Sequence, residues 1–225
     1  ADRRGKYLLM PLDSGDVMMI HLRMSGQVLI ADRGADRPLH THVVLSLDND
    51  TEMWFVDPRT FGEVVVFDPA NAVVELPPIA RLGVDPIAED FPRAHLRQLV
   101  RATSQTLKPF LLDQTKVAGI GNIYADEILH RARLRPDRAA NTIDAAATWR
   151  LHDAIRDILN DSIKVGGSTL GDAQYVDVDG ESGSFQNEHR VYGRTGQRCS
   201  TCGRGWIRRT ISGGRSTHYC PVCQH

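Results

Sequence analysis

All four cysteines of the 225-residue chain lie near its C-terminal end, in two Cys-x-x-Cys pairs. Seventeen residues separate the two pairs, which are Cys199 with Cys202 and Cys220 with Cys223. Two such pairs can supply four thiolates to one tetrahedral ion, as in zinc ribbons. A closed set of four thiolates leaves no open coordination position for catalysis. The spacing therefore predicts one structural Zn²⁺.

The residues between the cysteine pairs predict a β-hairpin that carries arginines. Strand-like runs at 206–211 and 215–219 flank a turn that contains Gly213 and Gly214. From Arg190 onward the chain has seven arginines and no Asp or Glu. Because the planar guanidinium matches phosphate, we expect the metal to support a phosphate-binding hairpin. The alternative is a structural zinc site whose only role is to stabilise the C-terminal end.

Composition and charge exclude several classes of protein. A hydrophobic content of 41% and a charged content of 24% are those of an ordinary protein with a real core. No apolar run approaches the about 20 residues that span a bilayer, and no signal peptide opens the chain, so we expect no membrane partner. A net charge of −1 excludes a uniformly basic DNA-binding protein but allows a local basic patch. Cysteines in metal-type pairs fit a reducing cytosol.

The chain divides into segments of different pattern. Residues 1–68 contain short β-rich runs separated by turn residues, which indicates an antiparallel sandwich or barrel. Residues 69–92 hold five of the eleven prolines and are predicted as a linker, because proline breaks helices and sheets. Residues 93–165 have helical periodicity. Residues 168–190 lack it, and a loop of this length is usually functional or disordered.

A second stretch with possible chemistry surrounds Asn122. A short helix is predicted to end near Gln114, a turn with Gly119 and Gly121 follows, and Asn122 can cap the next helix. Free backbone N–H groups at a helix start form an anion site, and glycines allow close approach. The alternative is an ordinary helix–turn–helix connection with a capping asparagine.

Four motifs occur in order along the chain. They are Arg-Gly-Lys-Tyr-Leu at 4–8 with Ile-His-Leu-Arg-Met-Ser-Gly at 20–26, Asp-Pro-Arg-Thr-Phe-Gly at 57–62, Gly-Ile-Gly-Asn-Ile-Tyr-Ala-Asp-Glu at 119–127, and the cysteine pairs. Together they resemble the bacterial formamidopyrimidine-DNA glycosylases, which remove oxidised purines and nick the resulting abasic site.

The resemblance implies an α+β fold. It consists of an N-terminal antiparallel β-sandwich (here expected to be incomplete), a C-terminal helix-two-turn-helix module and a zinc-ribbon β-hairpin. The predicted domains are a partial sandwich at 1–68, the linker at 69–92, the helical module at 93–190 with a lesion-capping loop at 170–190, and the zinc-ribbon finger at 191–225.

The resemblance also assigns roles to individual residues. Phosphate contacts are implied at four positions: Lys6, His21, Asn122 and Arg215. Filling of the void left by an extruded base is implied at three: Met24, Arg59 and Phe61. These assignments have alternatives. Lys6 could be a solvated charge at a strand edge, His21 a hydrogen-bonded histidine within a strand, and Arg215 a surface arginine of the hairpin. Met24 and Phe61 could be core residues. Arg23 stands where many members have Gly.

One departure from the family concerns the catalytic residues. Members begin with Pro-Glu-Leu-Pro-Glu, in which the proline amine is the nucleophile and the adjacent Glu is a proton shuttle. This sequence begins at Ala1 with Ala-Asp-Arg-Arg, which matches a strand inside the family's N-terminal domain. We therefore expect the N-terminal catalytic segment to be missing, no catalytic residue to be present, and this chain to be inactive.

The function implied by the resemblance is DNA base-excision repair. A bifunctional glycosylase and abasic-site lyase would remove 8-oxoguanine and formamidopyrimidines by base flipping and a Schiff-base intermediate. The expected partner is double-stranded DNA with an oxidised base or abasic site, bound by a monomer in the bacterial cytoplasm at the nucleoid. Two alternatives stay open: a non-catalytic zinc-ribbon module that binds damaged DNA, and an endonuclease VIII-type glycosylase for oxidised pyrimidines. The Arg-x-Phe pattern at 59–61 favours the purine enzyme.

Overall fold

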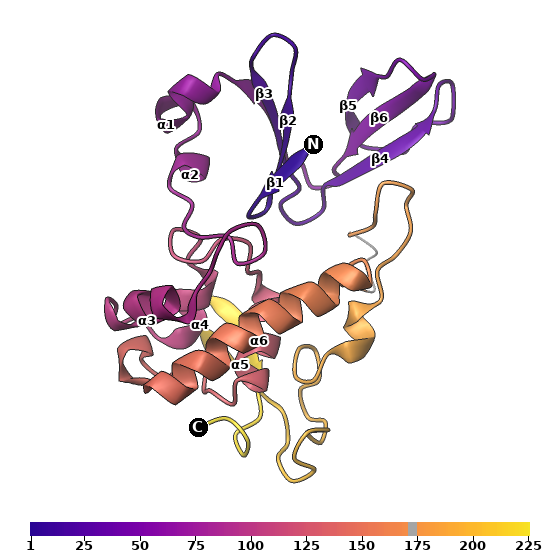
Figure 1. Cartoon of the computed structure of the whole chain (residues 1–225). Coiled ribbons are helices and arrows are strands. Elements are labelled where there is room, and N and C mark those ends of the chain that lie inside the picture. Colours follow the sequence, from indigo (N-terminus) through magenta and orange to yellow (C-terminus); the bar gives the residue numbers. More distant parts are fainter. Residues whose placement is uncertain (171–174) are drawn as a thin grey trace. The chain divides into compact units, whose positions relative to one another are not determined.

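The computed structural model describes residues 1–170 and 175–225 (Figure 1). The chain forms two compact units. The first unit consists of Ala1–Ala80 with Ser162–Glu188, and the second of Arg81–Asp161 with His189–His225. Among the described residues, no helix has the length and apolar character that crossing a membrane requires.

Two antiparallel sheets form the β part of the first unit (Figure 1). One sheet has the strand order β1-β2-β3-β7, with bounds Asp2–Arg4, Tyr7–Pro11, Val17–His21 and Glu63–Phe67. The other has the order β4-β6-β5, with bounds Gln27–Asp32, Thr51–Val56 and Thr41–Ser46. The predicted antiparallel N-terminal region is confirmed.

Side chains from both sheets meet in one core. Met18 and Ile20 of β3 cluster with Met53 and Phe55 of β6, and all four are buried. Alternate residues of a strand point to the same face, so each sheet contributes one apolar face to this core. The alternation of apolar residues in the sequence therefore specifies which face of each strand is buried.

The proline-rich segment that we predict as a linker contains three one-turn helices. They are η1 (Pro69–Asn71), α1 (Ala72–Glu75) and α2 (Pro77–Ala80). Proline is tolerated in a first turn because the missing N–H would have no partner inside the helix. Asp68 caps η1, since its carboxylate accepts a hydrogen bond from the N–H of Ala70 at 2.8 Å.

Helices form most of the second unit, which confirms the predicted helical region. Their bounds are α3 Arg93–Arg101, α4 Leu107–Leu112, α5 Asn122–Arg131, η2 Ala140–Thr142 and α6 Ala145–Lys164. The last residues of α6, from Ser162 onward, belong to the first unit, as does η3 (Phe185–Glu188). The buried positions repeat with helical spacing, as in Leu96 and Val100 of α3 and Leu151 and Ile155 of α6.

The predicted C-terminal hairpin is present in the second unit. Strands β8 (Arg208–Ser212) and β9 (Arg215–Tyr219) pair in an antiparallel register. Gly213 and Gly214 join them, with φ angles of 54° and 74°. Positive φ at both turn residues matches the twist of a two-residue hairpin and favours glycine there.

Candidate DNA-binding and metal sites

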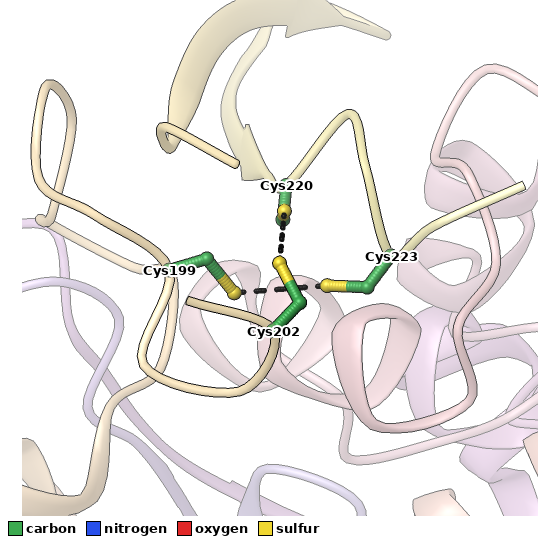
Figure 2. Close-up of side chains that lie close together, drawn as sticks. All are labelled: Cys199, Cys202, Cys220 and Cys223. Atoms are coloured by element: carbon green, nitrogen blue, oxygen red, sulfur yellow. Dashed lines mark hydrogen bonds between the residues drawn. The ribbon is translucent and has the colours of Figure 1, made fainter. Parts of the chain in front are cut away.

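The two cysteine pairs come together around one point. Their four Sγ atoms all lie within 4.8 Å of one another. Figure 2 shows them converging, with 3.6 Å between Cys199 and Cys223 and 3.8 Å between Cys202 and Cys220. Tetrahedral Zn–S bonds of about 2.3 Å would separate the sulfurs by about 3.8 Å. The four residues therefore fit a Zn²⁺ ion, as the spacing predicts.

Backbone groups around the cluster favour thiolates. The N–H of Gly205 donates to Cys202 Sγ at 3.4 Å. Backbone N–H groups of Gly205 and Arg204 lower the pKa of the Cys202 thiol to about 6. Burial raises the pKa of the Cys220 and Cys223 thiols, and the positive charge of a bound ion would offset that effect.

Asn122 and the hairpin meet in the second unit, although Asn122 and Ser216 are 94 positions apart in the chain. The Asn122 Nδ2 donates to the Ser216 carbonyl at 3.1 Å. Ser216 follows Arg215, the first residue of β9. The prediction that Asn122 caps α5 is wrong, because Gly121 occupies the cap position and Asn122 Oδ1, the atom that would accept a capping bond, has no partner among the described residues. The amide is instead held by the hairpin, which brings two predicted phosphate contacts close together.

The Asn122 side chain is only partly used by the fold. Its Oδ1 is buried and has no hydrogen-bond partner among the described residues. Its Nδ2 carries two N–H donors, and the bond to Ser216 needs one of them. Buried polar groups without partners are rare and mark places where strain, water or a ligand must be invoked.

A buried ion pair that sequence reasoning missed lies behind Asn122. Lys108 Nζ is 2.6 Å from Asp126 Oδ1, with both side chains 0% exposed, and 2.7 Å from the Asn122 carbonyl oxygen. Asp126 Oδ2 accepts from the backbone N–H of His218 at 2.8 Å and lies 3.0 Å from its Nδ1. Burial lowers the pKa of Lys108, and the charge of Asp126 opposes that shift. The pair joins α4, α5 and β9 around the predicted phosphate contacts.

Glu127, the next residue of α5, anchors the start of the predicted finger. Its carboxylate accepts the backbone N–H groups of Arg190, Val191 and Tyr192 at 2.9, 3.0 and 2.8 Å. Burial raises the pKa of Glu127, and these three bonds oppose the shift. Sequence reasoning missed this role, because nothing in the spacing relates Glu127 to residues more than 60 positions away.

The two remaining predicted phosphate contacts belong to the first unit. Lys6 is exposed in the turn between β1 and β2, and His21 ends β3. Burial, together with the charge of Arg23, lowers the pKa of His21 to about 4. The backbone N–H of Arg23 donates to His21 Nδ1 at 3.0 Å. The imidazole is therefore neutral at pH 7, and Nε2 carries the proton that it can donate.

The structure excludes the core alternative for the predicted void-filling residues. Met24 is 48% exposed and Phe61 is 53% exposed. The Arg59 guanidinium carbon lies 5.0 Å from the centroid of the Phe61 ring. Cation–π contact of this kind holds the two side chains together at the surface.

One buried carboxylate connects the two loops that carry these residues. Asp57 accepts from Ser25 Oγ at 2.5 Å, from the Gly62 N–H at 2.6 Å and from the Arg59 N–H at 3.2 Å. Its exposed fraction is 0%. Because Ser25 follows Met24, Asp57 fixes the Met24 loop against the loop of Arg59.

Comparisons with known proteins identify the family. The N-terminal domain of formamidopyrimidine-DNA glycosylase matches residues 1–64, and the H2TH domain of the same glycosylase matches residues 82–174. The formamidopyrimidine-DNA glycosylase of Pelotomaculum thermopropionicum is 44% identical over 223 residues, which are 99% of this chain and 79% of that protein. The chain belongs to the formamidopyrimidine-DNA glycosylase family.

Other members of the glycosylase family show similar agreement. The formamidopyrimidine-DNA glycosylase of Herpetosiphon aurantiacus is 45% identical over 224 residues. This match covers 99% of this chain and 79% of the Herpetosiphon protein. The crystal structure of the MutM (Fpg) protein from Thermus thermophilus superposes with a TM-score of 0.90 at 41% identity, covering 99% of this chain and 81% of that one. A complex of Lactococcus lactis Fpg with abasic-site DNA superposes with a TM-score of 0.88 at 37% identity. The match covers 100% of this chain and 80% of that one. The expected α+β architecture is thereby confirmed.

One expectation is not supported by the match of the N-terminal glycosylase domain. That domain aligns from residue 1, so it gives no support to the expectation that the N-terminal segment is missing. Both sheets of the first unit are formed and share a buried core.

The predicted lesion-capping loop is described except for residues 171–174, which lie outside the described part. Tyr175 Oη donates to the carbonyl of Arg23 at 2.6 Å, and the carbonyl of Val178 accepts from the Ile30 N–H at 2.8 Å. Arg23, at the position where we expect Gly in many family members, pairs with Glu63 at 2.5 Å. Within the first unit, the loop thus reaches the residue that precedes Met24.

Proposed function

We propose that this glycosylase family member recognises oxidised purines in duplex DNA for removal of the base and cleavage of the abasic site. The observation that carries the proposal is the Asn122–Ser216 bond, which holds Asn122 beside Arg215 at the start of α5. Solved relatives include family members in complexes with abasic-site DNA, Fapy-dG DNA and carbocyclic 8-oxo-G DNA.

The chemistry of the second unit suits a DNA phosphate. Arg215 offers charged donors, Asn122 offers a neutral donor, and the start of α5 offers the positive end of a helix. We assign Lys6 and His21 of the first unit to the same task, with His21 as a neutral Nε2–H donor. Contacts of this kind position the duplex and carry no base specificity.

Replacing the phosphate donors of the second unit should weaken DNA binding. For Arg215→Ala we expect lower affinity for an abasic-site duplex and a shallower salt dependence, by about 0.9 in the slope of log K against log salt, because one fewer counterion is released. Asn122→Ala should lower affinity with a smaller change in slope, because its donor is neutral. Fluorescence anisotropy over a salt series measures both quantities.

Arg131→Ala is the matched control for these variants. Arg131 also lies in the second unit, but its guanidinium pairs with Asp157 and Asp161 at the surface. We expect its affinity and salt slope to equal those of the wild type. Unchanged binding by both Arg215→Ala and Asn122→Ala would contradict the proposed phosphate site.

We assign void filling to Met24, Arg59 and Phe61. A base pulled out of the duplex leaves a gap, which an apolar side chain can occupy while an arginine faces the unpaired partner base. The exposure of Met24 and Phe61, and the carboxylate of Asp57 that ties their loops together, support this assignment.

Phe61→Ala should therefore weaken binding to a duplex with an oxidised purine more than binding to the same lesion in a single strand, because only the duplex has a stack to invade. Competition binding with the two substrates measures the ratio. Val66→Ala removes another exposed apolar side chain of the first unit and serves as the control. Equal losses on both substrates would assign Phe61 to packing instead.

We further propose one Zn²⁺ held by the four cysteines. Because four thiolates complete the coordination of the ion, its contribution is to hold the hairpin and not to activate water or substrate. What the ion supports is the strand that begins with Arg215.

In the proposed chemical step, an amine attacks C1′ of the deoxyribose and the glycosidic bond breaks, which releases the base and leaves a Schiff base. β-Elimination then breaks the C3′–O bond, with the 3′ phosphate as the leaving group. None of the 225 residues matches the family's proline–glutamate pair. Lysine amines are mostly protonated at neutral pH, with a pKa of about 10.4, and the reaction needs an amine placed about 3–3.5 Å from the carbon. We therefore expect these 225 residues to bind damaged DNA without forming a covalent intermediate.

Borohydride trapping on an 8-oxoguanine duplex tests this step. The 225-residue chain should give no trapped adduct, and the same chain preceded by a Pro-Glu-Leu-Pro-Glu segment should give one. A strong adduct from the 225 residues alone would contradict the expectation and would make the amines of Lys6 and Ala1 the next to replace.

A further inference from the structure

A buried histidine on α5 contacts the cysteine cluster. His130 Nε2 lies 3.6 Å from Cys199 Sγ and 3.6 Å from Cys223 Sγ. The His130 side chain is buried, with 4% of the residue exposed. The two cysteines come from different Cys-x-x-Cys pairs, so one ring nitrogen reaches both halves of the cluster.

The chemistry of metal-bound thiolates gives this contact a role. A thiolate accepts hydrogen bonds and cannot donate, and each N–H directed at it offsets part of its negative charge. Four thiolates on one Zn²⁺ leave a net charge of −2, which is unfavourable in a buried site. Cys202 receives the backbone N–H of Gly205 at 3.4 Å. For Cys199 and Cys223, the Nε2 atom of His130 is in position to donate a hydrogen bond.

The position of His130 on its helix connects the cluster to the proposed phosphate contact Asn122. Asn122, Asp126 and His130 are spaced by four residues and therefore lie along one face of α5. Asn122 binds the Ser216 carbonyl, Asp126 binds the His218 N–H, and His130 contacts the cysteines. This face of α5 thus contacts strand β9 of the hairpin at two successive points and the cysteine cluster at a third.

We propose that His130 is a positioning residue for the metal, donating Nε2–H to the thiolates of Cys199 and Cys223 and fastening the ion to the helix that presents Asn122. The inference rests on the proposed Zn²⁺ site and goes beyond it, because His130 is not one of the four ligands. It predicts that His130 contributes to metal affinity and to the electronic character of the thiolates.

The test compares the intact chain with His130→Phe, which removes the donor, and His130→Gln, which retains an N–H near the place of Nε2. In competition with a chromophoric zinc chelator, His130→Phe should bind Zn²⁺ about tenfold more weakly, as expected when a donor to a metal ligand is lost. His130→Gln should recover most of that affinity. His152→Phe removes another buried histidine of the second unit, whose Nε2 contacts the Phe91 carbonyl, and should bind Zn²⁺ like the wild type.

Two spectroscopic readouts separate a hydrogen bond from simple packing. In Co²⁺-loaded protein, the thiolate-to-metal charge-transfer band should shift in His130→Phe and return in His130→Gln. In cadmium-loaded wild type, which needs no variant to fold, NMR should detect coupling between the metal nucleus and the Nε2 proton of His130. Absence of that coupling, or wild-type affinity and band position in His130→Phe, would overturn the role of His130 alone. A wild-type chain that binds no Zn²⁺ would overturn this inference and the proposed metal site together.

Discussion

Asp126→Asn should lower the unfolding free energy of the second unit by about 3–5 kcal/mol, the usual cost of removing one partner of a buried ion pair. The ammonium of Lys108 would remain 0% exposed beside a neutral amide. The His218 N–H would also lose its carboxylate acceptor, since Oδ2 of Asp126 receives it at 2.8 Å. Both effects act at the point where α4, α5 and β9 meet.

Denaturant unfolding with a probe in the second unit measures this effect. Asp157→Asn is the matched control, because Asp157 pairs with Arg131 at the surface, where both side chains are about half exposed. An exposed pair contributes about 0–1 kcal/mol. A loss in Asp126→Asn no larger than in Asp157→Asn would show that the buried pair does not stabilise the unit. Weaker DNA binding should accompany the loss, because Lys108 also holds the Asn122 carbonyl.

Removal of zinc should disorder the hairpin and abolish binding to abasic-site DNA. The buried cluster around the hairpin is small and consists of Val191, Ile207, Cys199 and Cys220. A two-stranded hairpin is at best marginally stable by itself, and binding of a structural metal is then part of the folding free energy. Since β9 begins with Arg215, loss of its order also removes a proposed phosphate contact.

Elemental analysis of freshly purified, chelator-free protein should find one zinc per chain. After chelation, amide hydrogen exchange should accelerate in β8 and β9 and stay unchanged in β2 and β3 of the first unit. A chelator saturated with Zn²⁺ beforehand is the control and should change neither region. Protein without zinc, or unchanged exchange in β8 and β9 after chelation, would contradict the prediction.

The sequence by itself determined those features whose partners are near in the chain. Each Cys-x-x-Cys pair, the hairpin turn at Gly213 and Gly214, and the apolar face of β3 follow from spacing of two to four residues. Such short spacing is converted directly into geometry by the periods of strands, helices and turns. The ordered motifs also carried the family resemblance, which the comparisons confirm.

Only the tertiary structure decided how these elements are joined. The contacting pairs lie 18 to 94 positions apart in the chain: Lys108 with Asp126, Asn122 with Ser216, and His130 with Cys199. No sequence period relates residues so far apart, because their contact depends on how helices pack against the hairpin. The same reason explains why Asn122 looked like a helix cap. The local pattern favours an asparagine cap at a helix start. In the structure the hairpin packs against α5, and the Asn122 amide donates to the Ser216 carbonyl at 3.1 Å instead.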